Sequence, residues 1–239
     1  MSAKLLSATL LTGLAAGAYA YAGKWPTSQL FGRTLIAGDD INQIALTFDD
    51  GPNDPYTQQL LELLAQHQVQ AIFFLIGNFV RRRPDLARAI RQAGHLIGNH
   101  TMSHPSLMRE RPSRVRQELT DCNTVLEDAI GESVHWFRPP FGARRPDVLR
   151  TARELGLNPV MWNITAHDWD ATNSEALAVR VQRLLRRNQA RGRGSNLLLH
   201  DGGHREMGTD RSVTLAATKT LLDTWAGTEL RLVPLGVWQ

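Results

Sequence analysis

Short stretches rich in aliphatic and aromatic residues alternate with longer amphipathic stretches from residue 43 onward. This alternation is typical of an α/β fold built from parallel strands, which close as a barrel or lie open as a doubly wound sheet. The sequence contains neither the glycine fingerprint of a dinucleotide site nor a P-loop, which disfavours a nucleotide-binding open sheet. Strands are predicted at residues 43–48, 71–75, 95–98, 134–137, 158–162, 196–199 and 230–233.

Helices are predicted between these strands, because several of the intervening stretches begin with proline or a capping residue and end near glycine. They cover residues 57–66, 84–93, 112–122, 146–155, a stretch that begins at residues 173–174, and residues 213–225. The length of 239 residues suits one large domain, and 42% hydrophobic with 21% charged residues argues against a disordered or polytopic membrane protein. One core is therefore expected.

The N-terminal segment differs from the rest of the chain. Residues 5–22 carry no charge, and small residues at positions 18, 20 and 22 follow a signal-cleavage pattern. Residues 1–22 are therefore interpreted as an export signal or an N-terminal membrane anchor, which predicts an exported, periplasmic, cell-envelope or membrane-anchored protein. An apolar helix packed on the domain is the alternative, because Ala, Gly, Ser and Thr make the segment only weakly hydrophobic. Residues 23–40 are expected to be an irregular lead-in to a domain at residues 41–239.

The formal charge of +4 is carried mainly by arginine. Arginine runs at residues 81–83 and 186–193 lie at the ends of separate predicted helices and lack interleaved aromatic residues. Solvated helix ends are therefore favoured over a nucleic-acid site. An anionic cell-surface polymer is the other partner considered. Cys122, the only cysteine, is interpreted as a buried thiol in a helix.

Acidic, histidine and arginine residues follow several predicted strands at the point where each strand ends. These residues are Asp49, Asp50, His100, His104, Arg138, Asp168, His200 and Asp201. In parallel α/β proteins the carboxyl ends of the strands meet at one edge of the sheet, and chemistry gathers there. Five separate segments are therefore expected to converge on one mouth.

His100 and His104 are four residues apart, a spacing that brings two imidazoles to one point. The spacing alone is a weak signal, but two histidines and one carboxylate form an open site for Zn²⁺ or a related divalent ion. Water bound at such a site loses a proton near neutral pH. Asp49 and Asp50 point in different directions at a strand end, so one can bind the metal while the other takes the proton. A solvated Asp-Asp-Gly-Pro turn is the alternative.

Four motifs resemble, in order and approximate spacing, the signature motifs of the polysaccharide deacetylases, also called the NodB-homology domain or carbohydrate esterase family 4. They are TFDDGP at residues 47–52, HTMSHP at 100–105, RPPFG at 138–142 and LLHD at 198–201. The resemblance covers roughly residues 41–236. It implies a single-domain, distorted (β/α)7-type barrel of parallel strands, with the catalytic domain at residues 41–239, that removes acetyl groups from N-acetylated or O-acetylated glycans. Its implied cofactor is a divalent metal, usually Zn²⁺, with Co²⁺, Ni²⁺ and Mn²⁺ as alternatives.

Carried over to this sequence, the resemblance implies that Asp50, His100 and His104 are the metal ligands. Asp49 would be the general base that deprotonates a metal-bound water. His200 would be the general acid that protonates the departing amine.

The resemblance also implies supporting residues. Arg138 would hold Asp49 by a charge-assisted hydrogen bond, and the backbone N–H of Phe141 would help to stabilise the oxyanion. Leu198 would line the pocket for the acetyl methyl group.

One segment departs from the family pattern. The motif Asp-x-x-Asp-Trp is matched at Asp168 and Trp169, which are assigned to the substrate pocket, but Thr165 stands where the first Asp is expected. That first Asp orients and charges the acidic histidine in the family. Either Asp168 or another acid takes over this role, or His200 is less strongly biased toward its protonated form.

The remaining histidines and tryptophans are given non-chemical interpretations. His204 is interpreted as a mobile-loop residue close enough to touch substrate, and Trp162 either packs the barrel or stacks on a sugar. His95, His135 and His167 are interpreted as surface or core residues. Two other functions stay open: a catalytically weakened carbohydrate-binding barrel, and an amidase that acts on a non-sugar C–N bond at the same metal site.

Overall fold

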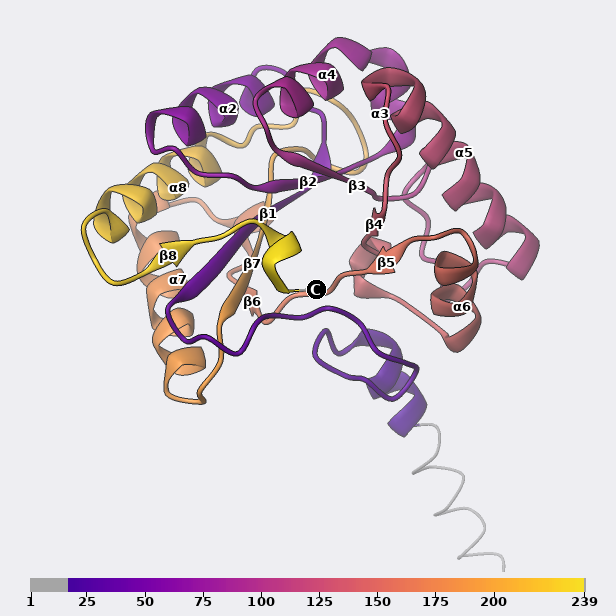
Figure 1. The fold of residues 1–239 in the computed structure, drawn as a ribbon, viewed down its shortest axis with the longest axis horizontal. Helices are drawn as coiled ribbons and strands as arrows, with labels where there is room; N and C mark the ends of the chain where they lie inside the picture. Colours follow the sequence, from indigo (N-terminus) through magenta and orange to yellow (C-terminus); the bar gives the residue numbers. More distant parts are fainter. Residues whose placement is uncertain (1–16, 239) are drawn as a thin grey trace, which may run out of the picture.

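The computed structural model describes residues 17–238, and its strands form one curved parallel sheet. The strands are β1 (Gln43–Gly51), β2 (Ile72–Leu75), β3 (Leu96–Asn99), β4 (Trp136–Phe137), β5 (Asn158–Pro159), β6 (Ile164–Thr165), β7 (Ser195–His200) and β8 (Arg231–Leu232). Their order is β5-β4-β3-β2-β1-β7-β6, with β8 beside β1. The sheet curves into an incomplete barrel whose two edges are β5 and β6 (Figure 1).

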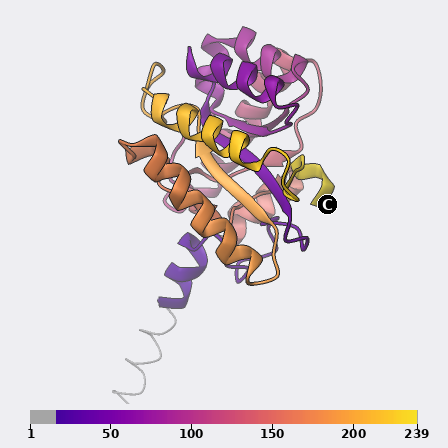
Figure 2. The ribbon, with the colours of Figure 1, turned by 90° about the vertical axis from the view of Figure 1, so that its left-hand side faces the viewer.

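Helices cover the outside of the curved sheet (Figure 1). They are α2 (Tyr56–Gln66), α3 (Gly77–Arg82), α4 (Pro84–Gln92), α5 (Pro112–Ile130), α6 (Pro146–Glu154), α7 (Ser174–Gln189) and α8 (Ser212–Trp225). Short 3₁₀ turns occur at η1 (Pro140–Gly142), η2 (Asp168–Asp170) and η3 (Leu235–Trp238). From the side, α7 and α8 lie against β1 and β7 (Figure 2).

The predicted distorted (β/α)7-type barrel is confirmed, and each of the seven predicted strands corresponds to a strand of the sheet. Strand β6 and helix α3 were not predicted, because both are too short to show a periodic pattern. Proline occupies the first turn of α4, α5 and α6, where its missing N–H costs no hydrogen bond. The Asn173 side chain caps α7 by accepting a hydrogen bond from the Ala176 N–H at 2.8 Å.

Strand β1 lies at the centre of the sheet and sends its side chains in two directions. Ile44, Leu46 and Phe48 pack in the main hydrophobic core with the helices, and all three are almost fully buried. The alternate residues Thr47 and Asp49 face the barrel interior instead, because successive side chains of a strand point to opposite faces. The pattern therefore delivers polar groups to the inside of the barrel.

The segment that precedes β1 is joined to the domain by backbone contacts. Residues 17–24 are helical, whereas residues 1–16, which include most of the predicted signal or anchor, lie outside the described residues. Leu35 forms a parallel bridge with Val160. The buried Arg144 guanidinium donates hydrogen bonds to the carbonyls of Trp25 and Ser28 at 2.8 and 2.9 Å. No helix within residues 17–238 has both the length and the apolar character needed to cross a bilayer.

Candidate active site

A bulge at the end of β1 separates the two adjacent carboxylates. Asp49 pairs in register with Phe74 and Gly51 with Leu75, so that Asp50 is the extra residue between them. Asp50 has a left-handed backbone conformation with φ 71°. Both carboxylates are buried, yet they face different partners: Asp50 faces two histidines, and Asp49 faces an arginine.

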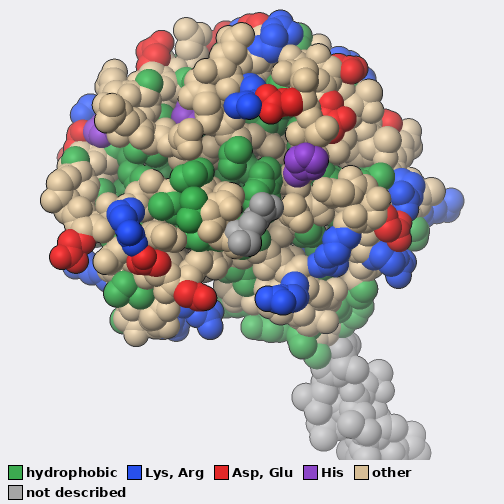
Figure 3. Space-filling model, viewed as in Figure 1, with side chains coloured by type: hydrophobic (Ala, Val, Ile, Leu, Met, Phe, Trp, Pro, Cys, Tyr) green, Lys and Arg blue, Asp and Glu red, His purple; other side chains and the backbone are tan. Residues whose placement is uncertain are grey.

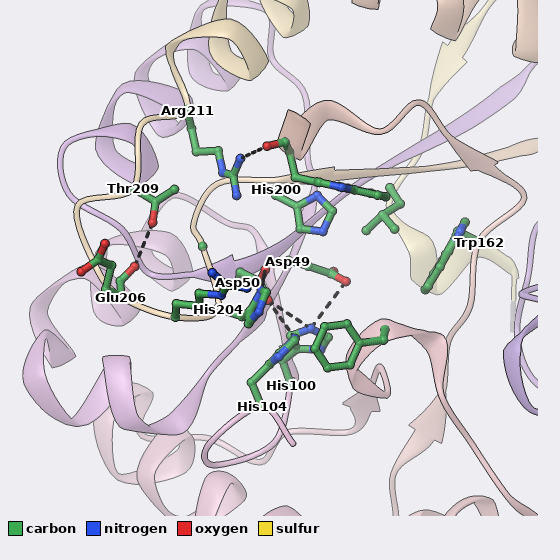
Figure 4. Close-up of a pocket in the computed structure, with 15 residues that line it drawn as sticks. Asp49, Asp50, His100, His104, Trp162, His200, His204, Glu206, Thr209 and Arg211 are labelled. Carbon is green, nitrogen blue, oxygen red and sulfur yellow. Dashed lines mark hydrogen bonds and ion pairs between the residues drawn. The ribbon is translucent and has the colours of Figure 1, made fainter. Parts of the chain in front are cut away.

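Asp50 lies against two imidazoles from the segment that follows β3. Its Oδ1 atom is 3.4 Å from Nε2 of His100 and 3.1 Å from Nε2 of His104. One ligand atom from each of the three buried residues lies within 4.8 Å of the others (Figure 4). The Nδ1 atom of His100 is 2.8 Å from the carbonyl oxygen of Arg138, a contact that leaves Nε2 to face the centre of the triad.

The triad fits a divalent metal ion by its donor set and its protonation. Asp50 Oδ1 is buried and has no hydrogen-bond partner within residues 17–238. Burial raises the pKa of Asp50, but the neighbouring His100 and His104 rings outweigh this effect and hold the pKa well below its usual value. Burial lowers the pKa of His104 and so favours the neutral imidazole that binds metals. One carboxylate and two imidazoles suit zinc and related ions, with a coordination position left open.

Strained backbone concentrates around this triad. Within residues 17–238, six residues other than glycine have positive φ: Asp50, Gln68, Thr101, His104, Phe141 and His167. All except Gln68 belong to the triad or to the loops that surround it. Such conformations cost roughly 1–3 kcal/mol each and persist where the surrounding structure imposes them, which is typical of functional sites.

Arg138 fixes the orientation of Asp49. Its Nη1 atom donates to Asp49 Oδ1 at 2.7 Å and to Thr47 Oγ1 at 2.8 Å, and the residue is fully buried. The guanidinium carbon also lies 4.2 Å from the centre of the Phe74 ring. The second oxygen, Asp49 Oδ2, is 3.7 Å from Nε2 of His100. Asp49 therefore presents one oxygen to Arg138 and the other to the triad.

His200 is paired with Asp168 on another side of the pocket. Its Nδ1 atom is 2.9 Å from Asp168 Oδ1, and its backbone N–H donates to Asp168 Oδ2 at 2.8 Å. Thr214 Oγ1 also donates to Asp168 Oδ2 at 3.0 Å. Burial lowers the pKa of His200, but the Asp168 carboxylate outweighs it, and the pKa rises to about 9. The structure thus identifies Asp168 as the partner that the sequence left open.

The geometry corrects the assignment of Asp168 to the substrate pocket. Asp168 is 2% exposed and lies behind His200, away from the pocket surface. Thr165, at the position of the missing family Asp, has a buried hydroxyl without a hydrogen-bond partner within residues 17–238. His200 therefore obtains its carboxylate from Asp168, without a contribution from Thr165.

A cavity of about 620 Å³ opens over the triad and brings the predicted residues together. Its walls include Asp49, Asp50, His100, His104, Phe141, Trp162, Trp169, Leu198 and His200. Leu198 is buried beside Trp162, which is 8% exposed and packs mainly within the barrel. Phe141 and Trp169 expose about half of their surfaces, 56% and 45%. The Phe141 N–H donates to no backbone carbonyl within residues 17–238, so it is free to meet a ligand.

Apart from His204, which was interpreted as a mobile-loop residue close enough to touch substrate, the sequence did not predict the contribution of the loop between β7 and α8. This loop supplies Gly203, His204, Arg205, Glu206, Thr209 and Arg211 to the pocket (Figure 4). The His204 ring stacks on that of His104 with 4.8 Å between ring centres, and its Nδ1 atom is 3.9 Å from Asp50 Oδ2. The polar residues directly after β7 were the one sequence feature that could have indicated this contribution. Contacts made by a loop do not produce a periodic pattern in the sequence.

Comparison with known proteins adds independent evidence to this geometry. A family model described as polysaccharide deacetylase matches residues 38–160. A chitooligosaccharide deacetylase of Rhizobium leguminosarum bv. trifolii is 37% identical over 166 residues, which cover 70% of this chain and 74% of that protein. The chain belongs to the polysaccharide deacetylase family.

Two further relatives extend this membership. A peptidoglycan-N-acetylglucosamine deacetylase of Bacillus cereus is 36% identical over 181 residues, 75% of this chain and 79% of that protein. A crystal structure of a peptidoglycan N-acetylglucosamine deacetylase in complex with 4-naphthalen-1-yl-N-oxidanyl-benzamide is 27% identical, with a TM-score of 0.76. That match covers 86% of this chain and 92% of the other. These polysaccharide deacetylases thus resemble this chain in both sequence and fold.

Proposed function

We propose that this polysaccharide deacetylase is a metal-dependent hydrolase that removes acetyl groups from an N-acetylated glycan. The observation that carries the proposal is the buried triad of Asp50, His100 and His104 with the Asp49 carboxylate beside it. Relatives named for chitooligosaccharide and for peptidoglycan N-acetylglucosamine support an N-acetylated sugar as the substrate class.

Asp50, His100 and His104 would hold the metal, and Zn²⁺ is the ion that we propose for this donor set. When bound, such an ion polarises a carbonyl oxygen and makes water more acidic. Asp49 would accept the proton of the attacking water through Oδ2, because Arg138 already occupies Oδ1. The buried ion pair keeps the other oxygen of the Asp49 carboxylate oriented toward the triad.

His200 would deliver a proton to the departing nitrogen, which leaves poorly unless it is protonated. Its partner Asp168 holds the ring through Nδ1, so that Nε2 is the atom available for proton transfer. The unpaired Phe141 N–H would donate to the oxygen that becomes negative during attack. Leu198 would contact the acetyl methyl group from the barrel side.

Replacing Asp168 with asparagine tests whether His200 is the general acid. Without this carboxylate, only the more weakly acting Asp50 and Asp49 oppose burial, so the pKa of His200 should fall from about 9. The imidazolium acts as the acid, and activity disappears as pH rises through its pKa. The alkaline limb of the kcat/KM profile should therefore move from near pH 9 to a lower pH in Asp168→Asn. An unmoved limb would remove His200 from the acid role.

We propose export to the cell envelope, with the N-terminal segment at a membrane surface. Tyr19, Tyr21 and Trp25 expose 46–55% of their surfaces, and Leu30 exposes 68%. Figure 3 displays hydrophobic side chains near the point where the described chain meets its N-terminal residues, with Lys and Arg side chains nearby. Exposed aromatic residues of this kind favour the interface between lipid and water.

Acetate release and metal analysis test the proposed function together. The purified protein should contain about one equivalent of divalent metal and release acetate from N-acetylglucosamine oligomers. Removal of the metal with a chelator should abolish release, and added Zn²⁺ should restore it. O-acetylated sugars and simple non-sugar amides, used as parallel substrates, distinguish the glycan N-deacetylase from an esterase or a general amidase. A metal-replete protein without acetate release would refute the proposal.

A further inference from the structure

We infer that His204 is a positioning residue of the proposed metal site, and that it holds the imidazole of His104 in place by stacking on it. This role rests on the proposed function, because His104 is one of the proposed metal ligands. The two histidines of the triad differ in how their rings are held, and this difference points to His204.

His100 has a hydrogen-bonding contact at its second ring nitrogen, whereas His104 has none. The Nδ1 atom of His100 is 2.8 Å from the carbonyl oxygen of Arg138. The Nδ1 atom of His104 is also buried, but it has no hydrogen-bond partner within residues 17–238. The imidazole of a metal ligand is normally oriented by a hydrogen bond at this second nitrogen. The ring of His104 must therefore be held in another way.

Two aromatic rings pack against the His104 ring. The His204 ring lies nearly parallel to it, with 21° between the ring planes and 4.8 Å between the ring centres (Figure 4). The Phe141 ring is nearly perpendicular to both histidine rings, with its centre 4.6 Å from that of His104 and 5.3 Å from that of His204. Aromatic rings attract one another at these distances. The two contacts together restrict rotation of the His104 ring.

Two consecutive glycines bring the backbone before His204 close to its neighbours. A Cβ atom at Gly202 would lie 2.1 Å from the carbonyl oxygen of Asp50. A Cβ atom at Gly203 would lie 2.4 Å from Oγ1 of Thr209. Both distances are far shorter than a van der Waals contact, so larger residues would push the loop away. The pair of glycines therefore allows His204 to reach the triad.

Hydrogen bonds hold the loop on both sides of His204. The Asn53 side chain donates to the carbonyls of Asp201 and Thr209 at 2.8 and 2.9 Å. It also accepts a hydrogen bond from the Gly208 N–H at 2.6 Å. The contacts of the protein itself thus set the position of His204 beside the triad.

The stacked arrangement favours support of His104 over direct binding of the metal by His204. The nitrogen lone pair that binds a metal lies in the plane of the imidazole ring, so two nearly parallel stacked rings do not direct their lone pairs at one ion. The Nδ1 atom of His204 is 3.9 Å from Oδ2 of Asp50, whereas Asp50 contacts His100 and His104 through Oδ1. The His204 side chain is also 39% exposed, unlike the three buried members of the triad.

Zinc affinity tests this role without a measurement of acetate release. The metal-free protein is titrated with Zn²⁺ in competition with a coloured zinc chelator. His204→Ala should bind Zn²⁺ about tenfold more weakly than the wild-type protein, as expected for the loss of a residue that orients a metal ligand. His204→Phe keeps a flat ring that can stack but has no ring nitrogen, so it should restore most of the wild-type affinity.

A Co²⁺-loaded sample separates stacking from direct binding. The visible absorption of Co²⁺ depends on the number and geometry of its ligands, so His204→Phe should retain the wild-type spectrum. A changed spectrum, together with a zinc affinity of His204→Phe as low as that of His204→Ala, would identify His204 as a fourth ligand. That result would overturn the inference.

His135→Ala is the matched control, because it removes an exposed histidine that does not line the pocket. It should bind Zn²⁺ as the wild-type protein does. Thermal unfolding of the metal-free proteins verifies that each variant is folded, as expected for changes at an exposed loop residue. Unchanged zinc affinity in His204→Ala would overturn the inference and leave the proposed function standing. A wild-type protein that binds no Zn²⁺ would instead refute both.

Discussion

His100→Ala should lose its divalent metal and lower kcat/KM for acetate release by about a thousandfold or more. The metal is expected to supply several kcal/mol of transition-state stabilisation, and every 1.36 kcal/mol corresponds to tenfold in rate. His100 is one of three buried candidate donors, and its Nδ1 contact with the Arg138 carbonyl fixes the orientation of the ring. Metal content by mass spectrometry and acetate release measure the two effects on the same sample.

His135→Ala is the matched control, because this histidine is exposed and remote from the triad contacts. It should keep both the metal and the activity. A thermal unfolding curve of each variant verifies that His100→Ala is folded. Full metal content in a folded His100→Ala protein would contradict the assignment of this triad.

Asp49→Asn should retain the metal but lower kcat by about a hundredfold to ten-thousandfold, the usual contribution of a general base. The asparagine oxygen still accepts the hydrogen bond from Arg138, which the carboxylate now receives at 2.7 Å. The amide, however, cannot accept a proton from water at neutral pH. Steady-state kinetics beside metal analysis separate this outcome from the loss of the metal site.

Asp128→Asn provides the charge control, since this carboxylate is exposed on α5. Its kcat and metal content should equal those of the wild-type protein. An Asp49→Asn variant with full metal content and unchanged kcat would show that another group takes the proton. A variant that loses both metal and activity would instead make Asp49 a ligand.

Sequence patterns predicted the parts of the site that lie on strand ends. Asp49, Asp50, His100 and His200 follow strands whose hydrophobic pattern is clear, and parallel strands bring their ends together. The bulge at Asp50 could not be predicted, because one extra residue at the end of a strand leaves no periodic signal. The different directions of the two carboxylates became clear only in the structure.

The parts of the site that could not be predicted depend on contacts between segments that are distant in the sequence. Asp168 and His200 are separated by 32 positions, and nothing local in the sequence tells which of several acids reaches the histidine. The absence of an Asp at Thr165 left open whether Asp168 or another acid takes over or whether the acid is weakened, and the structure places the Asp168 carboxylate against His200.

The contacts of Arg144 limit how far the chain can be shortened from its N-terminus. The family match begins at residue 38, but Arg144 binds the carbonyls of Trp25 and Ser28 and also that of Gly142, next to Phe141. Burial lowers the pKa of this arginine to about 10, because its charged form is costly away from water. A fragment trimmed to the family boundary would leave this cation with the Gly142 carbonyl as its one remaining acceptor among these three, three residues away from the proposed oxyanion donor Phe141. The segment before the matched region, through its contacts with Arg144, thus helps to hold the backbone beside Phe141 at the pocket in place.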